Sequence, residues 1–175
     1  MTDVISRAVR RPSEPAAATA GDEPRYELIE LLFFAYRDFV GGPDEILAEY
    51  GFGRAHHRVL HFVSRSPGMT VTDLLDILKI TKQSLGRVLK QLVDTGHIEQ
   101  RPGPVDRRQR LLYSTESGRR LALRLAALQS ERIEAAAATL GPEGTEAARR
   151  FLALLVNEEG RPDVLRFVGG EGVGR

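Results

Sequence analysis

The sequence from Thr70 to Thr115 reads TVTDLLDILKITKQSLGRVLKQLVDTGHIEQRPGPVDRRQRLLYST, and it carries the clearest structural signals in the chain. Thr70 is followed three residues later by Asp73, a spacing that lets each side chain satisfy a backbone amide at a helix start. A short helix is therefore predicted from about Val71. It must end within two turns, because Thr81 is a second helix cap.

A longer helix is predicted over residues 81–95, and Gly96 ends it. Its apolar residues recur at the three- and four-residue spacing of one buried face; they are Leu85, Val88, Leu89, Leu92 and Val93. Residues 98–101 then alternate like a strand, the Pro-Gly-Pro at 102–104 forces a turn, and residues 110–113 return as a second strand. Short helix, turn, longer helix and hairpin together predict a winged helix-turn-helix.

The exposed face of the 81–95 helix carries side chains that suit the base edges of a DNA major groove. Gln83, Ser84 and Arg87 are predicted to read bases, and Lys82 and Lys90 to contact the backbone or bases. The full set of predicted DNA-binding residues is Thr81, Lys82, Gln83, Ser84, Arg87, Lys90, Arg101, Asp106, Arg107, Arg108 and Arg110.

The charge of the chain is unevenly distributed along the sequence. Residues 79–110 hold eight Lys or Arg against three acids, a net charge of +5, although the whole chain is only +1. Residues 22–50 hold eight acids against two arginines, a net charge of −6. Because attraction to phosphate acts locally and decays within roughly 8 Å at physiological salt, the DNA-binding face is predicted at residues 79–110.

This part of the chain resembles the MarR family of bacterial transcription regulators. The resemblance rests on Ile98-Glu99-Gln100-Arg101, on the wing sequence Asp106-Arg107-Arg108, and on Thr115-Glu116-Ser117-Gly118 opening a long helix, and it covers roughly residues 25–158. It implies a mainly α fold with a small β-hairpin wing and with N- and C-terminal dimerisation helices. It also implies that Asp106 braces the wing, that Arg108 enters the minor groove, and that the protein is a repressor.

Two residues depart from the family pattern. Ser114 stands where a leucine is common, and Gly86 lies inside the predicted recognition helix. A glycine there costs about 1 kcal/mol relative to alanine. Either a phosphate or a neighbouring helix that approaches the backbone closely would account for it.

A length of 175 residues predicts one domain with tails. The expected boundaries are a disordered tail over 1–22, a domain over 23–160 and a C-terminal tail over 161–175, with the DNA-binding lobe at about 52–115 and dimerisation helices at about 25–40 and 116–158. The chain has no cysteine, no apolar run long enough to span a bilayer and no signal core near its start. These features predict a cytoplasmic protein.

Dimerisation is predicted from the residues between Tyr26 and Val40, which are apolar on nearly all sides. A helix of this kind needs two surfaces to bury it, and a second copy of the chain supplies one of them. Gly41-Gly42-Pro43 is predicted to break this helix, and Pro43 to open a short one ending near Tyr50. Further helices are predicted over residues 54–65, 116–140 and 143–158, with Gly141-Pro142 separating the last two.

Three of the four histidines lie in the 54–65 helix, at positions 56, 57 and 61. The four-residue spacing of His57 and His61 suits two metal ligands on one helix face. A pocket for a small effector is the stronger hypothesis, with Phe33, Tyr36, Arg37, His57 and His61 as its candidate residues. No cofactor is assigned from the sequence, and ordinary core and interface packing is the remaining reading.

The leading hypothesis is a homodimeric transcription regulator, with helix 81–95 in the major groove and wing 98–113 at the minor groove of a palindromic operator. A small-molecule effector would relieve binding. One alternative is a winged-helix protein-interaction module, and another is a metal- or haem-responsive sensor that uses His56, His57 and His61. An enzyme is not predicted, because the chain lacks a Gly-rich phosphate loop, a cysteine nucleophile and a Gly-x-Ser-x-Gly elbow.

Overall fold

The structure of the protein is a computed structural model that describes residues 24–170. The predicted tail at 1–22 lies outside the described residues, as do the last five residues of the chain. The described residues divide into two compact units, the first ending at Ala35 and the second beginning at Tyr36. Within the described part, no helix has the length and apolar character needed to cross a bilayer.

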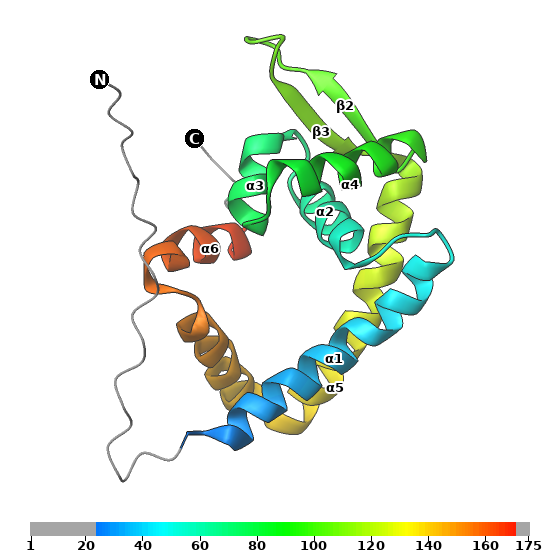
Figure 1. Ribbon diagram of the computed structural model, residues 1–175. Coiled ribbons are helices and arrows are strands. Elements are labelled where there is room, and N and C mark those ends of the chain that lie inside the picture. Colours follow the sequence, from blue (N-terminus) through cyan, green and yellow to red (C-terminus); the bar gives the residue numbers. More distant parts are fainter. Residues whose placement is uncertain (1–23, 171–175) are drawn as a thin grey trace, which may run out of the picture. The chain divides into compact units, whose positions relative to one another are not determined.

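The helix-turn-helix is found within one residue of the predicted boundaries. Helix α3 spans Val71–Leu78 and helix α4 spans Lys82–Asp94, and both pack against α2, which spans Arg54–Arg65 (Figure 1). Leucines from all three helices are fully buried in one core with the sheet and the first turns of α5. The predicted stop after α2 is confirmed, since the helix ends at Arg65 and Gly68 adopts a positive φ of 88°.

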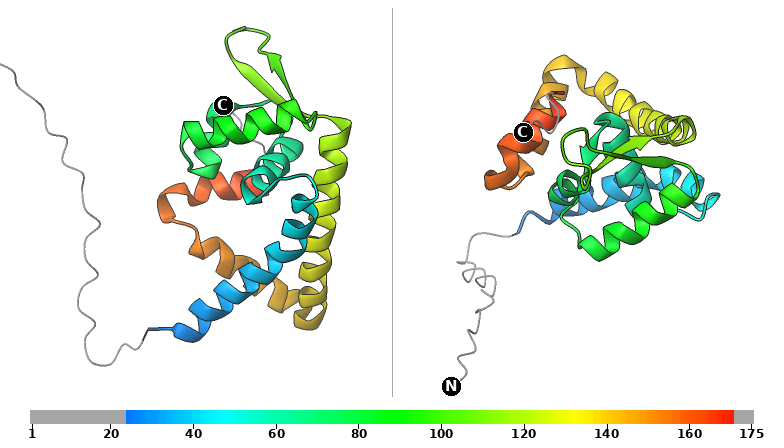
Figure 2. Two further views of the ribbon diagram at one scale, coloured as in Figure 1. Left: turned by 45° about the vertical axis from the view of Figure 1, so that its right-hand side comes forward. Right: turned by 90° about the horizontal axis from the view of Figure 1, so that it is seen from above.

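The wing is an antiparallel hairpin of β2, Ile98–Pro102, and β3, Arg110–Ser114, as predicted. Ile98 pairs with Ser114 at its base and Pro102 with Arg110 near its tip. The sequence did not predict a third strand, β1, in which Met69 and Thr70 pair with the outer edge of β3 to give the order β1-β3-β2. The left view of Figure 2 shows the hairpin extending beyond α4.

Helix α1 spans Tyr26–Ala48, so the predicted break at Gly41-Gly42-Pro43 is wrong. Val40, Pro43, Ile46 and Leu47 form a buried stripe that continues across the Gly-Gly-Pro sequence. A proline inside a helix costs about 3 kcal/mol and a glycine about 1 kcal/mol. Burying each Val, Ile or Leu side chain contributes about 1.5–3 kcal/mol, so the packing outweighs the local preference.

Helix α5 spans Glu116–Leu155 and confirms the predicted interruption, because Gly141 has a non-helical backbone with φ 71° and ψ 177°. Its start is fixed by Thr115, whose hydroxyl oxygen accepts a hydrogen bond from the Gly118 amide at 3.1 Å. A Cβ at Gly118 would lie 1.9 Å from the His97 carbonyl oxygen, so only glycine fits there.

Residues 158–168, which the sequence analysis divided between the end of a helix and a tail, form a 3₁₀ turn at Glu158–Gly160 and helix α6 at Arg161–Val168. Helix α5 ends at Leu155, three residues before the predicted helix end, and the turn follows it. Phe167 of α6 contacts Phe62 of α2, with ring centroids 5.4 Å apart. This contact attaches α6 to the helix that supports α3 and α4.

Candidate nucleic-acid interface

The two helices of the helix-turn-helix each begin at a threonine cap. The Thr70 amide donates to Asp73 Oδ2 at 2.8 Å, and the Asp73 amide donates to Thr70 Oγ1 at 3.1 Å, which is the reciprocal box predicted from the sequence. Lys79 ends α3 in a left-handed conformation, with φ 51°. Thr81 Oγ1 then accepts from the Ser84 amide at 3.2 Å, so α4 starts at a fixed place and angle.

Helix α4 has one apolar and one polar face. Leu85, Val88, Leu89 and Leu92 are buried in the core. The opposite face is exposed and consists of Lys82, Gln83, Ser84, Gly86, Arg87 and Lys90, with Thr81 at the cap. All the α4 residues that were predicted from the sequence to contact DNA therefore lie on its exposed face.

The tip of the wing is a tight turn. The Gly103 amide donates to the Gln109 carbonyl at 2.9 Å, the Gln109 amide donates to the Asp106 carbonyl at 3.1 Å, and Asp106 Oδ1 accepts from the Arg108 amide at 2.9 Å. A Cβ at Gly103 would lie 2.7 Å from the Asp106 carbonyl oxygen. The turn thus depends on Gly103 and Asp106, and it presents the exposed Arg107 and Arg108 at its outer end.

Two predicted DNA-binding cations are engaged within the chain. Arg101 forms an ion pair with Glu99 and lies over the Tyr113 ring, 4.3 Å from its centroid. Lys90 Nζ lies 2.5 Å from Asp94 Oδ2. Both pairs are exposed and are therefore worth little, so a stronger anion can displace them. Among the described residues, no ion pair involves the other five predicted cations, Lys82, Arg87, Arg107, Arg108 and Arg110.

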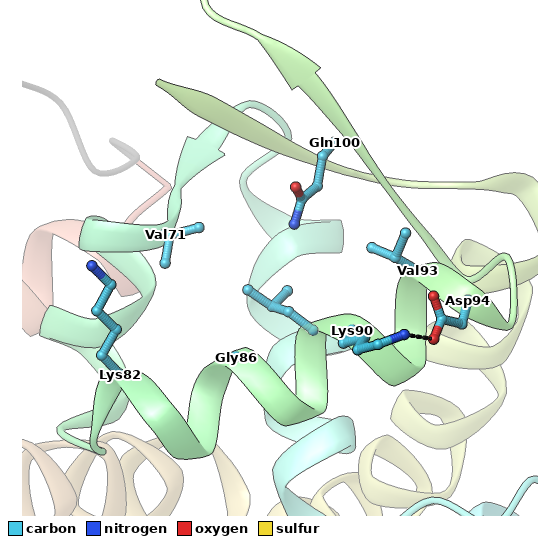
Figure 3. Close-up of a pocket in the computed structure, with 8 residues that line it drawn as sticks. Val71, Lys82, Gly86, Lys90, Val93, Asp94 and Gln100 are labelled. Carbon is cyan, nitrogen blue, oxygen red and sulfur yellow. Dashed lines mark hydrogen bonds and ion pairs between the residues drawn. The ribbon is translucent and has the colours of Figure 1, made fainter. Parts of the chain in front are cut away.

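A groove of about 420 Å³ separates the polar face of α4 from the wing. Figure 3 shows Gly86 between Lys82 and Lys90 along the helix, with Gln100 of β2 on the opposite side. Val71, Leu89 and Val93 supply its apolar surface, and Asp94 lies at the same end as Lys90. The groove therefore combines a basic rim with an apolar floor.

His97 lies where α4 meets β2, and nothing in the sequence indicated a special role for it. Its side chain is only 6% exposed, and its ring contacts the rings of Tyr50 and Phe52 edge-on at 5.6 and 5.1 Å. Nδ1 is 3.0 Å from Thr95 Oγ1, whereas Nε2 is buried without a hydrogen-bond partner among the described residues. Burial lowers the pKa of His97, and a hydrogen bond with the Thr95 backbone partly opposes this effect.

The other three histidines all lie in α2, and no further metal ligands join them among residues 24–170. His56 accepts from the Gly53 amide at 3.1 Å, and its Nε2 lies 2.9 Å from Gln91 Oε1. Burial lowers the pKa of His57, and the charge of His61 adds to this effect. In the described part of the chain, no three His, Cys, Asp or Glu side chains converge to hold a metal ion. The metal-sensor hypothesis gains no support from this geometry.

The structure places the remaining effector candidates as follows. Tyr36 accepts a hydrogen bond from Arg58 at 3.3 Å and lies below the Arg54 guanidinium, 5.8 Å from the ring centroid. Arg37 pairs with Asp38 at 2.7 Å. Phe33 belongs to the first unit and is 68% exposed. A second hollow, of about 560 Å³, is lined by other residues, which include Asp38, Phe39, Glu131 and Arg132.

Comparison with known proteins decides the family. Residues 50–109 match the model of the MarR family. Over 136 residues the chain is 45% identical to the HTH-type transcriptional regulator PetP of Rhodobacter capsulatus, covering 78% of this chain and 82% of PetP. The chain belongs to the MarR family. Its members are transcription regulators, so the prediction of a regulator rather than an enzyme is confirmed.

Solved structures of MarR-family regulators share the fold. A structure of Streptococcus pneumoniae FabT in complex with DNA matches with a TM-score of 0.66 and 18% identity, covering 75% of this chain and 94% of FabT. The transcriptional repressor CouR, bound to a 23-mer DNA duplex, matches with a TM-score of 0.60 and 24% identity, covering 75% of this chain and 91% of CouR. The predicted winged-helix fold of this MarR-family chain is thereby confirmed.

Proposed function

We propose that this MarR-family regulator is a homodimeric repressor that binds double-stranded DNA at a palindromic operator. The observation that carries the proposal is the combination, within one packed lobe, of a polar α4 face and a basic wing tip. The two elements are joined through the buried residues Leu92, Ile98 and Leu112, which belong to the same core. Two such helices, one from each protomer, would enter successive major grooves about one helical turn apart.

The exposed side chains divide by the chemistry that each offers to DNA. Gln83, Ser84 and Arg87 reach toward base edges, since amides and guanidinium groups can form paired hydrogen bonds with them. The DNA sugar-phosphate backbone is contacted by Thr81, Lys82, Lys90 and Arg101. Arg101 first leaves its contact with the Tyr113 ring. The minor groove is contacted by the wing residues Arg107, Arg108 and Arg110. Asp106 stabilises the turn that presents Arg108.

Two further observations support a DNA partner over a protein partner. The exposed residues of α4 are polar or glycine, whereas a protein-binding face would carry exposed apolar side chains. In addition, the relatives FabT and CouR, which share the fold, are described as bound to DNA, and CouR is described as a repressor. The proposed DNA-binding lobe is residues 52–115, within a domain of residues 23–160.

The homodimer is supported in each unit by apolar side chains that the unit leaves exposed. In the first unit, Leu31, Phe33 and Phe34 are 56%, 68% and 54% exposed. In the second unit, Phe151, Leu152, Leu154 and Leu155 are 49–65% exposed near the end of α5. Clusters of this kind mark interaction surfaces in proteins, and a second copy of the chain would bury them.

A small-molecule effector completes the proposal. It would bind beside Tyr36, Arg37, His57 and His61 of the second unit, and would lower the affinity for DNA by favouring a different spacing of the two DNA-binding lobes. The regulator would act in the cytoplasm, where the DNA is.

The experiment that tests the proposal is selection of bound fragments from the genome of the source organism by the purified protein at about 150 mM salt, because affinity depends steeply on salt. We expect recovery of a short palindrome and a complex of two protomers per duplex by sedimentation. Enrichment of no sequence, with no binding to any duplex at low salt, would contradict the proposal and favour a protein-interaction module.

A further inference from the structure

Gly86 occupies a position where nothing in the described chain requires a glycine. It lies near the middle of α4, where alanine is the better helix former, and its φ is not positive. A Cβ added to Gly86 would meet no atom within 4 Å. Close packing against a neighbouring helix, one of the two explanations that the sequence left open, is therefore excluded within the described residues. The remaining explanation is a partner that approaches the helix from outside.

The surroundings of Gly86 indicate what that partner is. Lys82, Gly86 and Lys90 follow one another at four-residue intervals, which places them on one stripe of the helix. The stripe forms one side of the groove between α4 and β2, and Figure 3 shows Gly86 as the gap between the two lysines. A cation at each side of a gap in an open groove is complementary to a chain of phosphates.

We infer that one sugar-phosphate strand of the DNA runs through this groove and crosses α4 at Gly86, with Lys82 and Lys90 on its phosphates. The inference rests on the proposed DNA-binding function. If α4 lies in a major groove and the wing lies in the adjacent minor groove, the strand that separates those two grooves must pass between α4 and β2. Gly86 provides the room, because any side chain there would project into the path of the strand.

Two details of the groove fit a sugar-phosphate strand. Its floor of Val71, Leu89 and Val93 offers apolar contact for deoxyribose rings. Asp94 lies at one end of the groove with its Oδ2 2.5 Å from Lys90 Nζ, and this exposed pair is weak enough for a phosphate to replace the carboxylate. Because the phosphate contacts are independent of sequence, the inference can be tested before any operator is known.

The test compares Gly86→Ala and Gly86→Leu with the wild type on a random-sequence duplex, as a function of salt concentration. Both variants should fold, since both replacements are better helix formers, and we expect the melting temperature of Gly86→Ala to rise by roughly 2–4 °C. Affinity should fall with side-chain size, by about tenfold or more for Gly86→Leu at low salt. The leucine removes no charge, yet it should lower the salt slope by nearly two units, because two phosphate contacts are lost.

Lys90→Ala and Gly41→Ala provide the comparisons. Lys90→Ala alone should lower the slope of DNA affinity against salt concentration by about one unit. In the double variant with Gly86→Leu, it should reduce the DNA affinity little further, because the phosphate is already out of reach of Lys90. Gly41→Ala is the matched control, since Gly41 also lies inside a helix and a Cβ there meets nothing within 4 Å. It should raise stability without changing DNA affinity.

Two outcomes would overturn the inference and leave the proposed function intact. One is wild-type affinity and slope for Gly86→Leu. The other is a loss of affinity with an unchanged slope, which would place a base rather than a phosphate at Gly86. Failure of the wild-type protein to bind any duplex at low salt would instead remove the proposed function together with the inference.

Discussion

The lobe formed by α2, α3, α4 and the wing differs from the distal part of the chain, residues 126–170, in how much of its apolar surface it buries. In the lobe, Leu60, Leu74, Leu85 and Leu92 are fully buried. Between residues 126 and 170 no side chain is buried, although this stretch contains ten large apolar residues that are 37–65% exposed. Both regions lie in the second unit, so the difference is internal to one compact body.

The apolar side chains of the lobe are buried within one chain, whereas many of those in residues 126–170 are left exposed by it. The lobe completes its core together with α1 and the first turns of α5, and its exposed side chains are mostly polar, as expected for a surface that meets DNA. The distal helices leave apolar groups outside, as expected for a surface that meets protein.

The largest effect is expected when a charge is placed in the distal apolar surface. Phe151→Asp, or Phe33→Asp in the first unit, should weaken dimerisation by more than a hundredfold, because an unpaired buried charge costs about 3–5 kcal/mol. Sedimentation at micromolar concentration should show monomer or aggregate. Arg150→Asp, which places the same carboxylate one residue earlier at an exposed position, is the control. Stable dimers in both phenylalanine variants would place the interface elsewhere.

The next effect compares one leucine from each region. Leu92→Ala removes a fully buried side chain and should lower the free energy of unfolding by about 2–5 kcal/mol at every protein concentration. Leu154→Ala removes a side chain that is 65% exposed, so its effect should appear only through the dimer and should depend on protein concentration. Urea unfolding at two protein concentrations measures both. Equal, concentration-independent losses would show that the distal region completes its own core.

A smaller effect is expected from the wing tip. Arg108→Ala should weaken DNA binding by about 1–3 kcal/mol, if the side chain enters the minor groove, without changing the dimer or the melting temperature. Fluorescence anisotropy on a selected operator measures the affinity. Arg150→Ala removes the same charge from the distal region and should leave affinity unchanged. Equal affinities for wild type and Arg108→Ala would remove the wing from the mechanism.

The smallest effect is a pH dependence that arises in the lobe. Because burial lowers the pKa of His97 in the folded state, the unfolded state binds more protons below the ordinary value of about 6.5. The contribution of neutral His97 to the free energy of unfolding is therefore fully present above pH 6.5, and it is lost as the pH falls toward the pKa of His97 in the folded state. His97→Leu should flatten the slope of unfolding free energy between about pH 5 and 6.5, and comparison at pH 8 isolates the packing change. An unchanged slope would assign the dependence to His57 and His61, whose pKa values are also lowered by burial.

Much of the fold and interface could be predicted because their signals are local. Thr70, Thr81 and Thr115 mark helix starts by hydrogen bonds that span three residues, and each start is found where the sequence predicts it. The two-residue strand β1 gives no comparable signal, because Met69 and Thr70 are strand residues only through their pairing with β3. His97 was missed for the same reason, since its burial depends on Tyr50 and Phe52, which are far away in sequence.

The helix-turn-helix, the hairpin and the charge of their exposed faces could therefore be predicted from the sequence alone, because caps, turns and periodicity act over a few residues. The continuation of α1 through Gly41-Gly42-Pro43 depends on tertiary packing, because the buried stripe of Val40, Ile46 and Leu47 outweighs the local preference for a break. The explanation of Gly86 also depends on the tertiary structure. A glycine in a helix is compatible with internal packing or with an external partner, and only the positions of all neighbouring atoms distinguish the two.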